Sequence, residues 1–110
     1  MIEKDVFDYL SSTLSVDVYM EEPEVKPDSY VVIQKTGSSM EDYIEHATLA
    51  IQGYALSMYD AALLNESIKE RMLFEAPDVI NMTVKLNSDY NFTDTTTKRY
   101  RYQAVFDIIN

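Results

Sequence analysis

Two stretches of the chain carry hydrophobic residues at helical spacing. In residues 2–14 they recur about every four positions, among mostly polar or charged residues, which predicts an amphipathic helix. A second helix is predicted from Ser57, a residue type suited to cap its amino end, with Asp60 three positions later. Pro77 is expected to end that helix, because proline lacks the N–H that a helix interior needs. The two hydrophobic stripes are Ile2, Val6, Leu10 and Leu14, and Ala61, Leu64, Ile68 and Met72.

Five other stretches have the composition or the two-residue period of a strand. They cover residues 16–20, 30–36, 46–54, 80–86 and 100–108. In residues 46–54 the alternation separates two faces of one strand. One face carries Ala47, Leu49, Ile51 and Gly53, and the other carries Thr48, Ala50, Gln52 and Tyr54.

Three polar segments are predicted to be loops between these strands. Residues 21–28 (EEPEVKPD) contain two prolines and read as a solvated loop. Residues 37–45 (GSSMEDYIE) are predicted to be a mobile, acidic hairpin loop, and residues 87–97 (NSDYNFTDTTT) a polar loop. The element order is therefore α-β-β-β-α-β-β. It predicts an α+β fold in a single domain, residues 1–110, with a mostly antiparallel or mixed sheet of about five strands and two helices packed on one face.

Composition narrows the classes of partner. The chain has 110 residues, 19 acidic against 9 basic, and a formal net charge of −10. That balance argues against a general nucleic-acid-binding face, which needs clustered cations, and against an anionic membrane as partner. Cysteine is absent, which excludes disulfides and thiolate sites. The amino end, MIEKDVFDYL, is acidic and amphipathic and does not resemble a signal peptide, so we expect synthesis and folding in a cytoplasm.

No residue pattern favours catalysis. His46 is the only histidine, and Glu45 beside it would point to the opposite face of a strand, so a polar residue at a strand start is the favoured interpretation. Asp89, Asn91 and Thr93 alternate like the first half of a calcium loop. The glycine and glutamate of that motif are missing, and turn chemistry explains the same residues. We therefore expect no enzyme, and no catalytic, cofactor-binding or metal-binding residues.

Two features suggest association. Residues 1–55 carry 11 acidic and 3 basic residues, whereas residues 56–110 carry 8 and 6, with the basic cluster at Lys98, Arg99 and Arg101. Acidic and basic surfaces on one subunit could meet head to tail in a ring, although a mixed solvated surface explains the same charges. The chain also has nine tyrosines, a residue common at interfaces, although a half-buried sheet face would accommodate most of them.

Three stretches carry a family resemblance. They are YVVIQKTGSS from Tyr30, DYIEHATLAIQGYALSMYDAALLNESIKE from Asp42, and LNSDYNFTDTTTKRYRYQAVFDI from Leu86. With the rest of the chain they resemble small tail proteins of siphophages and prophages of Gram-positive bacteria, described as tail terminator, tail completion or minor tail proteins. The most specific part is DYNFTDTTTKRYRYQAVFD.

The resemblance implies a virion protein of the tail and neck, made in the bacterial host cytoplasm. Such a protein caps the tail tube as a hexameric ring and takes part in head–tail joining, without catalysis or cofactor. The implied partners are other copies of the chain, the major tail tube protein and a head-connector or neck protein; DNA passes through without specific binding, and no membrane is involved. An acidic lumen would repel the phosphates of that DNA. The alternatives are another neck or minor tail component, or a small ligand-binding domain around His46.

Two loops are then expected to line the channel or face a neighbour, residues 38–45 and 88–96, with the basic cluster serving contacts to a neighbour or the tube. The expected interface residues are Ser38, Ser39, Glu41, Asp42, Tyr43, Asp89, Tyr90, Phe92, Asp94, Lys98, Arg99 and Arg101.

Overall fold

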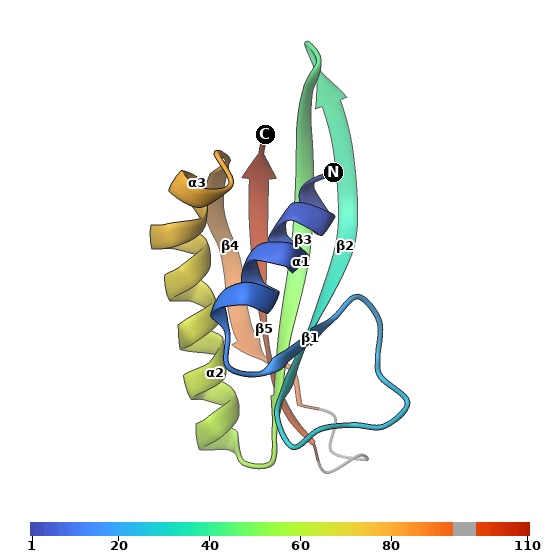
Figure 1. Cartoon of the computed structure of the whole chain (residues 1–110), viewed down its shortest axis with the longest axis vertical. Helices are drawn as coiled ribbons and strands as arrows, with labels where there is room; N and C mark the ends of the chain where they lie inside the picture. Colours follow the sequence, from blue (N-terminus) through green and yellow to red (C-terminus); the bar gives the residue numbers. More distant parts are fainter. Residues whose placement is uncertain (94–98) are drawn as a thin grey trace.

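One five-stranded sheet, with helices on one of its faces, organises the chain (Figure 1). The computed structural model describes residues 1–93 and 99–110. Its elements are α1 (Ile2–Thr13), β1 (Asp17–Tyr19), β2 (Tyr30–Glu41), β3 (Ile44–Ala55), α2 (Met58–Glu70), the π-helical turn η1 (Arg71–Glu75), α3 (Ala76–Val79), β4 (Thr83–Asn91) and β5 (Tyr100–Ile109). The predicted α+β class and element order are confirmed.

The strands are arranged in the order β1-β2-β3-β5-β4. β1 is parallel to β2, and every other neighbouring pair is antiparallel. Both α1 and α2 cross the same face of this sheet (Figure 1). We call the opposite face the open face.

The main core lies between the helices and the sheet. Ile51 and Phe106 are fully buried there, and the predicted helix stripes face them. Gly53 allows close packing, because a Cβ atom at this position would lie 3.1 Å from Cγ of Leu64 on α2. The predicted cap is also present: Ser57 Oγ accepts a hydrogen bond from the Asp60 backbone N–H at 3.1 Å.

The prediction of a loop over residues 37–45 was wrong. β2 continues to Glu41 and pairs with β3, so a long hairpin projects beyond the body of the molecule (Figure 1). Its two-residue turn, Asp42 and Tyr43, has positive φ values of 52° and 66°. These are the left-handed angles of a tight hairpin turn, for which the usual sequence signal is a glycine or asparagine. Aspartate is also accepted at the first position of such turns, but tyrosine at the second is unusual. Pairing along the two long strands therefore holds Tyr43 in this conformation.

Two other boundaries also differ from the prediction. β4 begins at Thr83, later than expected, because Asn81 adopts a positive φ of 54° in the turn after the helix. It continues to Asn91 through a segment predicted to be a loop. The strand pattern is hidden there because the pairing register shifts between Leu86 and Ser88, which interrupts the alternation of side chains.

The helix does not end at Pro77. It passes through η1 and continues to Val79. The Ala76 N–H bonds to the carbonyl of Arg71, five residues back, and this widened turn precedes the residue that has no N–H to donate. Among the described residues, no helix is long and apolar enough to cross a membrane.

Candidate functional site

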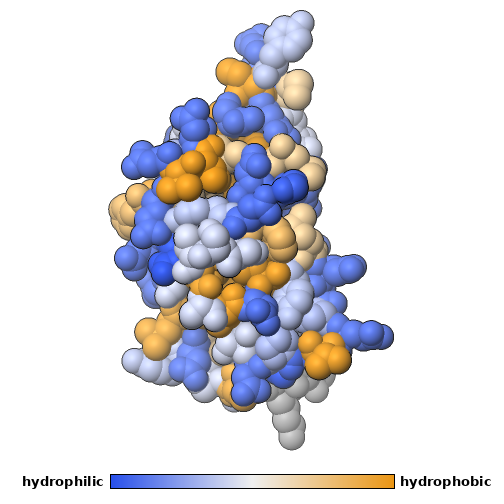
Figure 2. Space-filling view, in the orientation of Figure 1, coloured by the Kyte–Doolittle hydropathy of each residue, from blue (hydrophilic) through white to orange (hydrophobic). Residues whose placement is uncertain are grey.

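The hairpin tip, residues 38–45, is the most exposed part of the sheet. It carries five of the expected interface residues, Ser38, Ser39, Glu41, Asp42 and Tyr43, all of them exposed. The Tyr43 side chain is 97% exposed and that of Met40 is 68% exposed. The tip projects beyond the body in the space-filling view (Figure 2). On the body, hydrophobic side chains form separate patches among charged ones. Exposed hydrophobic side chains also occur elsewhere, for example Phe74 at 76%, and the tip differs because it places two of them on one projecting hairpin.

The open face carries a row of amide and hydroxyl groups across β3, β5 and β4. Gln52 Nε2 donates to Gln103 Oε1 at 2.7 Å, and Gln103 Nε2 donates to the Tyr90 hydroxyl at 2.5 Å. The Tyr54 hydroxyl donates to Gln52 Oε1 at 3.2 Å. The two glutamines are only 7% and 8% exposed, so each amide depends on these protein partners for its hydrogen bonds.

A row of aromatic rings and one arginine lies beside these glutamines. Tyr30 and Tyr54 are stacked with ring centroids 4.4 Å apart. The Arg101 guanidinium lies 4.2 Å from the Phe92 ring centroid and 5.4 Å from that of Tyr54. Its Nη1 donates to the Tyr54 hydroxyl at 2.9 Å and its Nε to the Phe92 carbonyl at 2.7 Å. Burial raises the pKa of Tyr54, and Arg101 opposes that rise.

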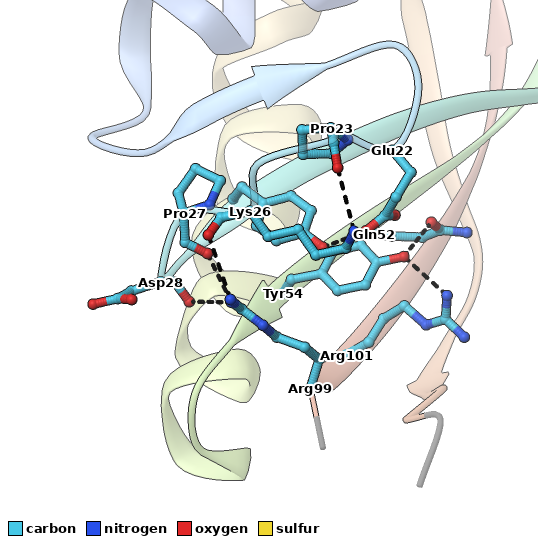
Figure 3. Close-up of polar contacts among 10 residues, drawn as sticks. Glu22, Pro23, Lys26, Pro27, Asp28, Gln52, Tyr54, Arg99 and Arg101 are labelled. Atoms are coloured by element: carbon cyan, nitrogen blue, oxygen red, sulfur yellow. Dashed lines mark hydrogen bonds and ion pairs between the residues drawn. The ribbon is translucent and has the colours of Figure 1, made fainter. Parts of the chain in front are cut away.

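Residues 20–29, which we call the covering loop, pack over one end of the open face (Figure 3). Arg99 holds this loop: its Nη1 donates to the Pro27 carbonyl at 2.7 Å and to the Asp28 carbonyl at 3.2 Å. The Tyr30 hydroxyl donates to Glu22 at 2.5 Å. Burial, followed by this bond to a carboxylate, raises the pKa of Tyr30 above its ordinary value. A groove of about 530 Å³ remains between the covering loop and the glutamine row.

The Asp89 side chain lies on the helix-covered face of the sheet, whereas that of the adjacent Tyr90 lies on the open face. Its carboxylate accepts from Lys69 Nζ at 3.0 Å and from Asn65 Nδ2 at 3.1 Å, both on α2. Hydrogen bonds to Glu66 and then to Asp89 raise the pKa of Lys69. Asp89 therefore fixes β4 to the helix, while Tyr90 takes part in the row on the open face.

Apart from Asp89, the expected interface residues that the structure describes fall into two groups. The hairpin tip and the covering loop lie towards opposite ends of a molecule 44 Å long and 24 Å wide (Figure 1). Tyr90, Phe92, Arg99 and Arg101 are brought together near the covering-loop end, where both arginines also make contacts within the chain. Asp94 and Lys98 lie outside the described residues.

Residues not selected from the sequence complete the open face: Glu22, Tyr30, Gln52, Tyr54 and Gln103. One signal in the sequence pointed to two of them. In the predicted strand over residues 46–54, Gln52 and Tyr54 lie on the same face, which places two large polar side chains next to each other.

His46 lines a shallow groove of about 330 Å³ with Ser39 and Asp107. The Asp107 carboxylate is engaged elsewhere, accepting from Thr48 Oγ1 at 3.0 Å and Asn87 Nδ2 at 3.1 Å. No cluster of three potential metal-ligating side chains is present in the part of the chain that the structure describes. Asn91 Oδ1 accepts from the Thr93 backbone N–H at 3.0 Å, as the turn interpretation of this segment expects.

A scan against protein-family models finds none that matches this chain. A search of curated proteins also finds no match.

Proposed function

We propose that this chain is a structural protein of a bacteriophage tail, which caps the tail tube and joins it to the head by assembling into a ring. The observation that carries the proposal is the hairpin tip. It holds Met40 and Tyr43 in water at one end of the molecule, beside the carboxylates of Glu41 and Asp42. The exposed side chains of the tip would be buried when a second protein surface covers it. The sequence resemblance to small siphophage tail proteins supplies the biological setting.

Two different surfaces on one subunit support a ring more than a two-fold dimer. A head-to-tail contact joins one surface of a subunit to a different surface of the next, and it closes into a ring when a whole number of equal rotations makes one full turn. The hairpin tip is acidic, whereas Arg99 and Arg101 lie near the other end of the chain's long axis. A hexamer is the stoichiometry that the resemblance implies.

The net charge fits a ring through which DNA passes. At −10 per subunit, a ring concentrates negative charge around its lumen, and that charge repels phosphates. The proposed partners are therefore other copies of this chain, the tail tube protein and a neck protein, with DNA in transit. The proposed location is the virion, at the head-proximal end of the tail.

Light scattering and electron microscopy with tail tubes from the phage that carries the gene test this proposal. We expect concentration-dependent oligomers, or binding at one end of the tubes. Tyr43→Ser should weaken the association at least tenfold, because it removes a large exposed contact side chain. Tyr59→Ser is the matched control: Tyr59 is 72% exposed, at the start of α2 and outside both surfaces. A chain that stays monomeric at all concentrations and does not bind tube ends would refute the proposal.

A further inference from the structure

Both edges of the sheet expose unpaired backbone over the same length of chain. β2 has 12 residues, and β1 pairs with only three of them, Tyr30 to Val32. The nine from Ile33 to Glu41 have no strand on their outer side among the described residues. β4, at the other edge, is also nine residues long. Unpaired N–H and C=O groups along an edge are a template for another strand.

The strand directions make these two edges complementary. β2 is antiparallel to β3, β3 to β5, and β5 to β4. β4 therefore runs opposite to β2. When a second copy is placed beside the first in the same orientation, its β2 lies antiparallel to β4 of the first copy, and the alternation of directions continues across the boundary.

The two edges also bend at the same level. β2 shifts register between Lys35 and Gly37, and β4 between Leu86 and Ser88. The pairings connect these points across the sheet, because Lys35 is opposite Leu49, Leu49 opposite Phe106, and Phe106 opposite Leu86. A bulge bends its strand and increases its twist. Both edges are therefore irregular at the same level of the sheet.

A polar row fixes this level on the open face. Thr36 Oγ1 donates to the Thr48 carbonyl at 3.3 Å, and Thr48 Oγ1 donates to Asp107 at 3.0 Å. Asn87 Nδ2 donates to the other oxygen of Asp107 at 3.1 Å. Thr36 and Asn87, the two residues without a partner in the register, are thus at the two ends of one row.

Of the usual devices that protect an exposed edge, each edge here has a bulge and one lysine but no proline. Proline is the strongest block to pairing, and the prolines of this chain, Pro23, Pro27 and Pro77, lie outside both edges. Each edge carries one lysine. The Lys35 ammonium group is drawn towards α1 by Glu3 at 3.3 Å.

We propose that residues Thr83–Tyr90 of β4 in one copy pair antiparallel with residues Ile33–Met40 of β2 in the next copy, with Asn87 level with Thr36, so that one sheet continues from subunit to subunit. This inference rests on the proposed ring and gives it a side-by-side contact in place of an end-to-end contact between the hairpin tip and the arginines. The partner is a second copy of this chain, recognised through main-chain hydrogen bonds. The β2 strand of the hairpin then forms part of the contact between two subunits, and the hairpin also projects beyond the body of each subunit.

Disulfide cross-linking between introduced cysteines tests this pairing without competing disulfides, because the chain has no cysteine of its own. Thr36→Cys and Asn87→Cys are made as separate variants, mixed under assembly conditions and oxidised. Neighbouring residues on paired strands have Cβ atoms about 4.5–5.5 Å apart, close enough for a disulfide after a small adjustment. We expect at least ten times more disulfide dimer in the mixture than in either variant alone. Thr36→Cys mixed with Glu70→Cys, an exposed position on α2, is the control.

Hydrogen exchange of the unmodified chain provides a second measurement that needs no substitution. Assembly should slow amide exchange at least tenfold in residues 33–41 and 83–91 and leave α2 unchanged. Protection of both edges without the disulfide supports the pairing of β4 with β2 and overturns the register that places Asn87 level with Thr36. A ring that assembles without protection at the edges, or a disulfide formed only between two copies of Thr36→Cys, overturns the inference and leaves the proposed function intact. Edge pairing without any binding to tail tubes supports the inference and overturns only the tube-capping role in the proposed function.

Discussion

The two faces of the sheet are buried by different kinds of side chain. Beneath α1 and α2 the sheet presents hydrocarbon, with Ile51 and Phe106 fully buried. On the open face Tyr30 is equally buried and Gln52 nearly so, yet the cover there is a loop and neighbouring polar side chains. The first face is stabilised mainly by the removal of apolar area from water. The second depends on complete hydrogen bonding, because a buried polar group without a partner is costly.

The largest expected effect is on the helix-covered face. Phe106→Ala should lower the free energy of unfolding by about 3–5 kcal/mol, since it leaves a cavity at a fully buried position. Val105→Ala is the control, because Val105 is the adjacent residue on the open face and is only partly buried. It should cost less than half as much. Guanidinium chloride denaturation measures both, and equal losses would contradict the distinction between the faces.

On the open face, the loss of two hydrogen bonds should matter more than lost volume. Gln103→Met keeps the size of the side chain but removes the acceptor of Gln52 and the donor to Tyr90. We expect a loss of about 2 kcal/mol, the cost of leaving buried polar groups unpaired. The double variant Gln52→Met/Gln103→Met should cost less than the sum of the two single variants. Additive losses would show that the two amides are energetically independent.

Alkaline pH tests one buried tyrosine on each face. The Tyr9 hydroxyl, on the helix side, donates to Glu75 at 2.7 Å, and burial together with this bond raises the pKa of Tyr9 to about 12. The pKa of Tyr30 on the open face is raised as well. In both cases the unfolded chain loses its proton first, near pH 10, so stability is complete below pH 10 and falls as the pH rises.

For Tyr9 alone the loss should reach about 1.4 kcal/mol at pH 11. Denaturation curves from pH 8 to 11 measure it, and Tyr9→Phe and Tyr30→Phe should each flatten the decline. A decline that neither substitution changes would assign the alkaline sensitivity to other groups.

The periodic parts of the fold could be predicted from sequence, and its irregular joints could not. Alternation identified β3 and both of its faces, and the four-residue spacing identified α1 and α2. The errors lie where one residue changes the period: the register shift after Leu86, the widened turn before Pro77, and a hairpin turn without glycine. Each is stabilised by contacts with other strands or helical turns, which a local pattern does not contain.

The open face was harder to foresee for a related reason. Gln52 and Gln103 are 51 positions apart in sequence, and only the pairing register of β3 with β5 places them side by side. Tyr90, Phe92 and Arg101 were selected from composition and resemblance, and the register brings them onto this face. The partners of Arg99 in the covering loop lie more than 70 positions away.

The smallest expected effect concerns the covering loop, the feature that most distinguishes the open face from the helix-covered one. Arg99 donates to the carbonyls of Pro27 and Asp28 through one nitrogen and to that of Lys26 through the other. Arg99→Lys keeps the charge but has a single ammonium group, which cannot reproduce that fork. We expect a loss of at most about 1 kcal/mol in global stability, because the bonds are partly exposed.

Local opening of the covering loop should increase more than global unfolding, since a loop held by few contacts opens independently of the core. Faster proteolysis and amide exchange within residues 20–29, with unchanged exchange in β3, would confirm it. Lys85→Arg, a charge-conserving change on an exposed position of β4, is the control. If Arg99→Lys destabilised the whole sheet as strongly as Phe106→Ala, the covering loop would be part of the core and the two faces would be buried in the same way.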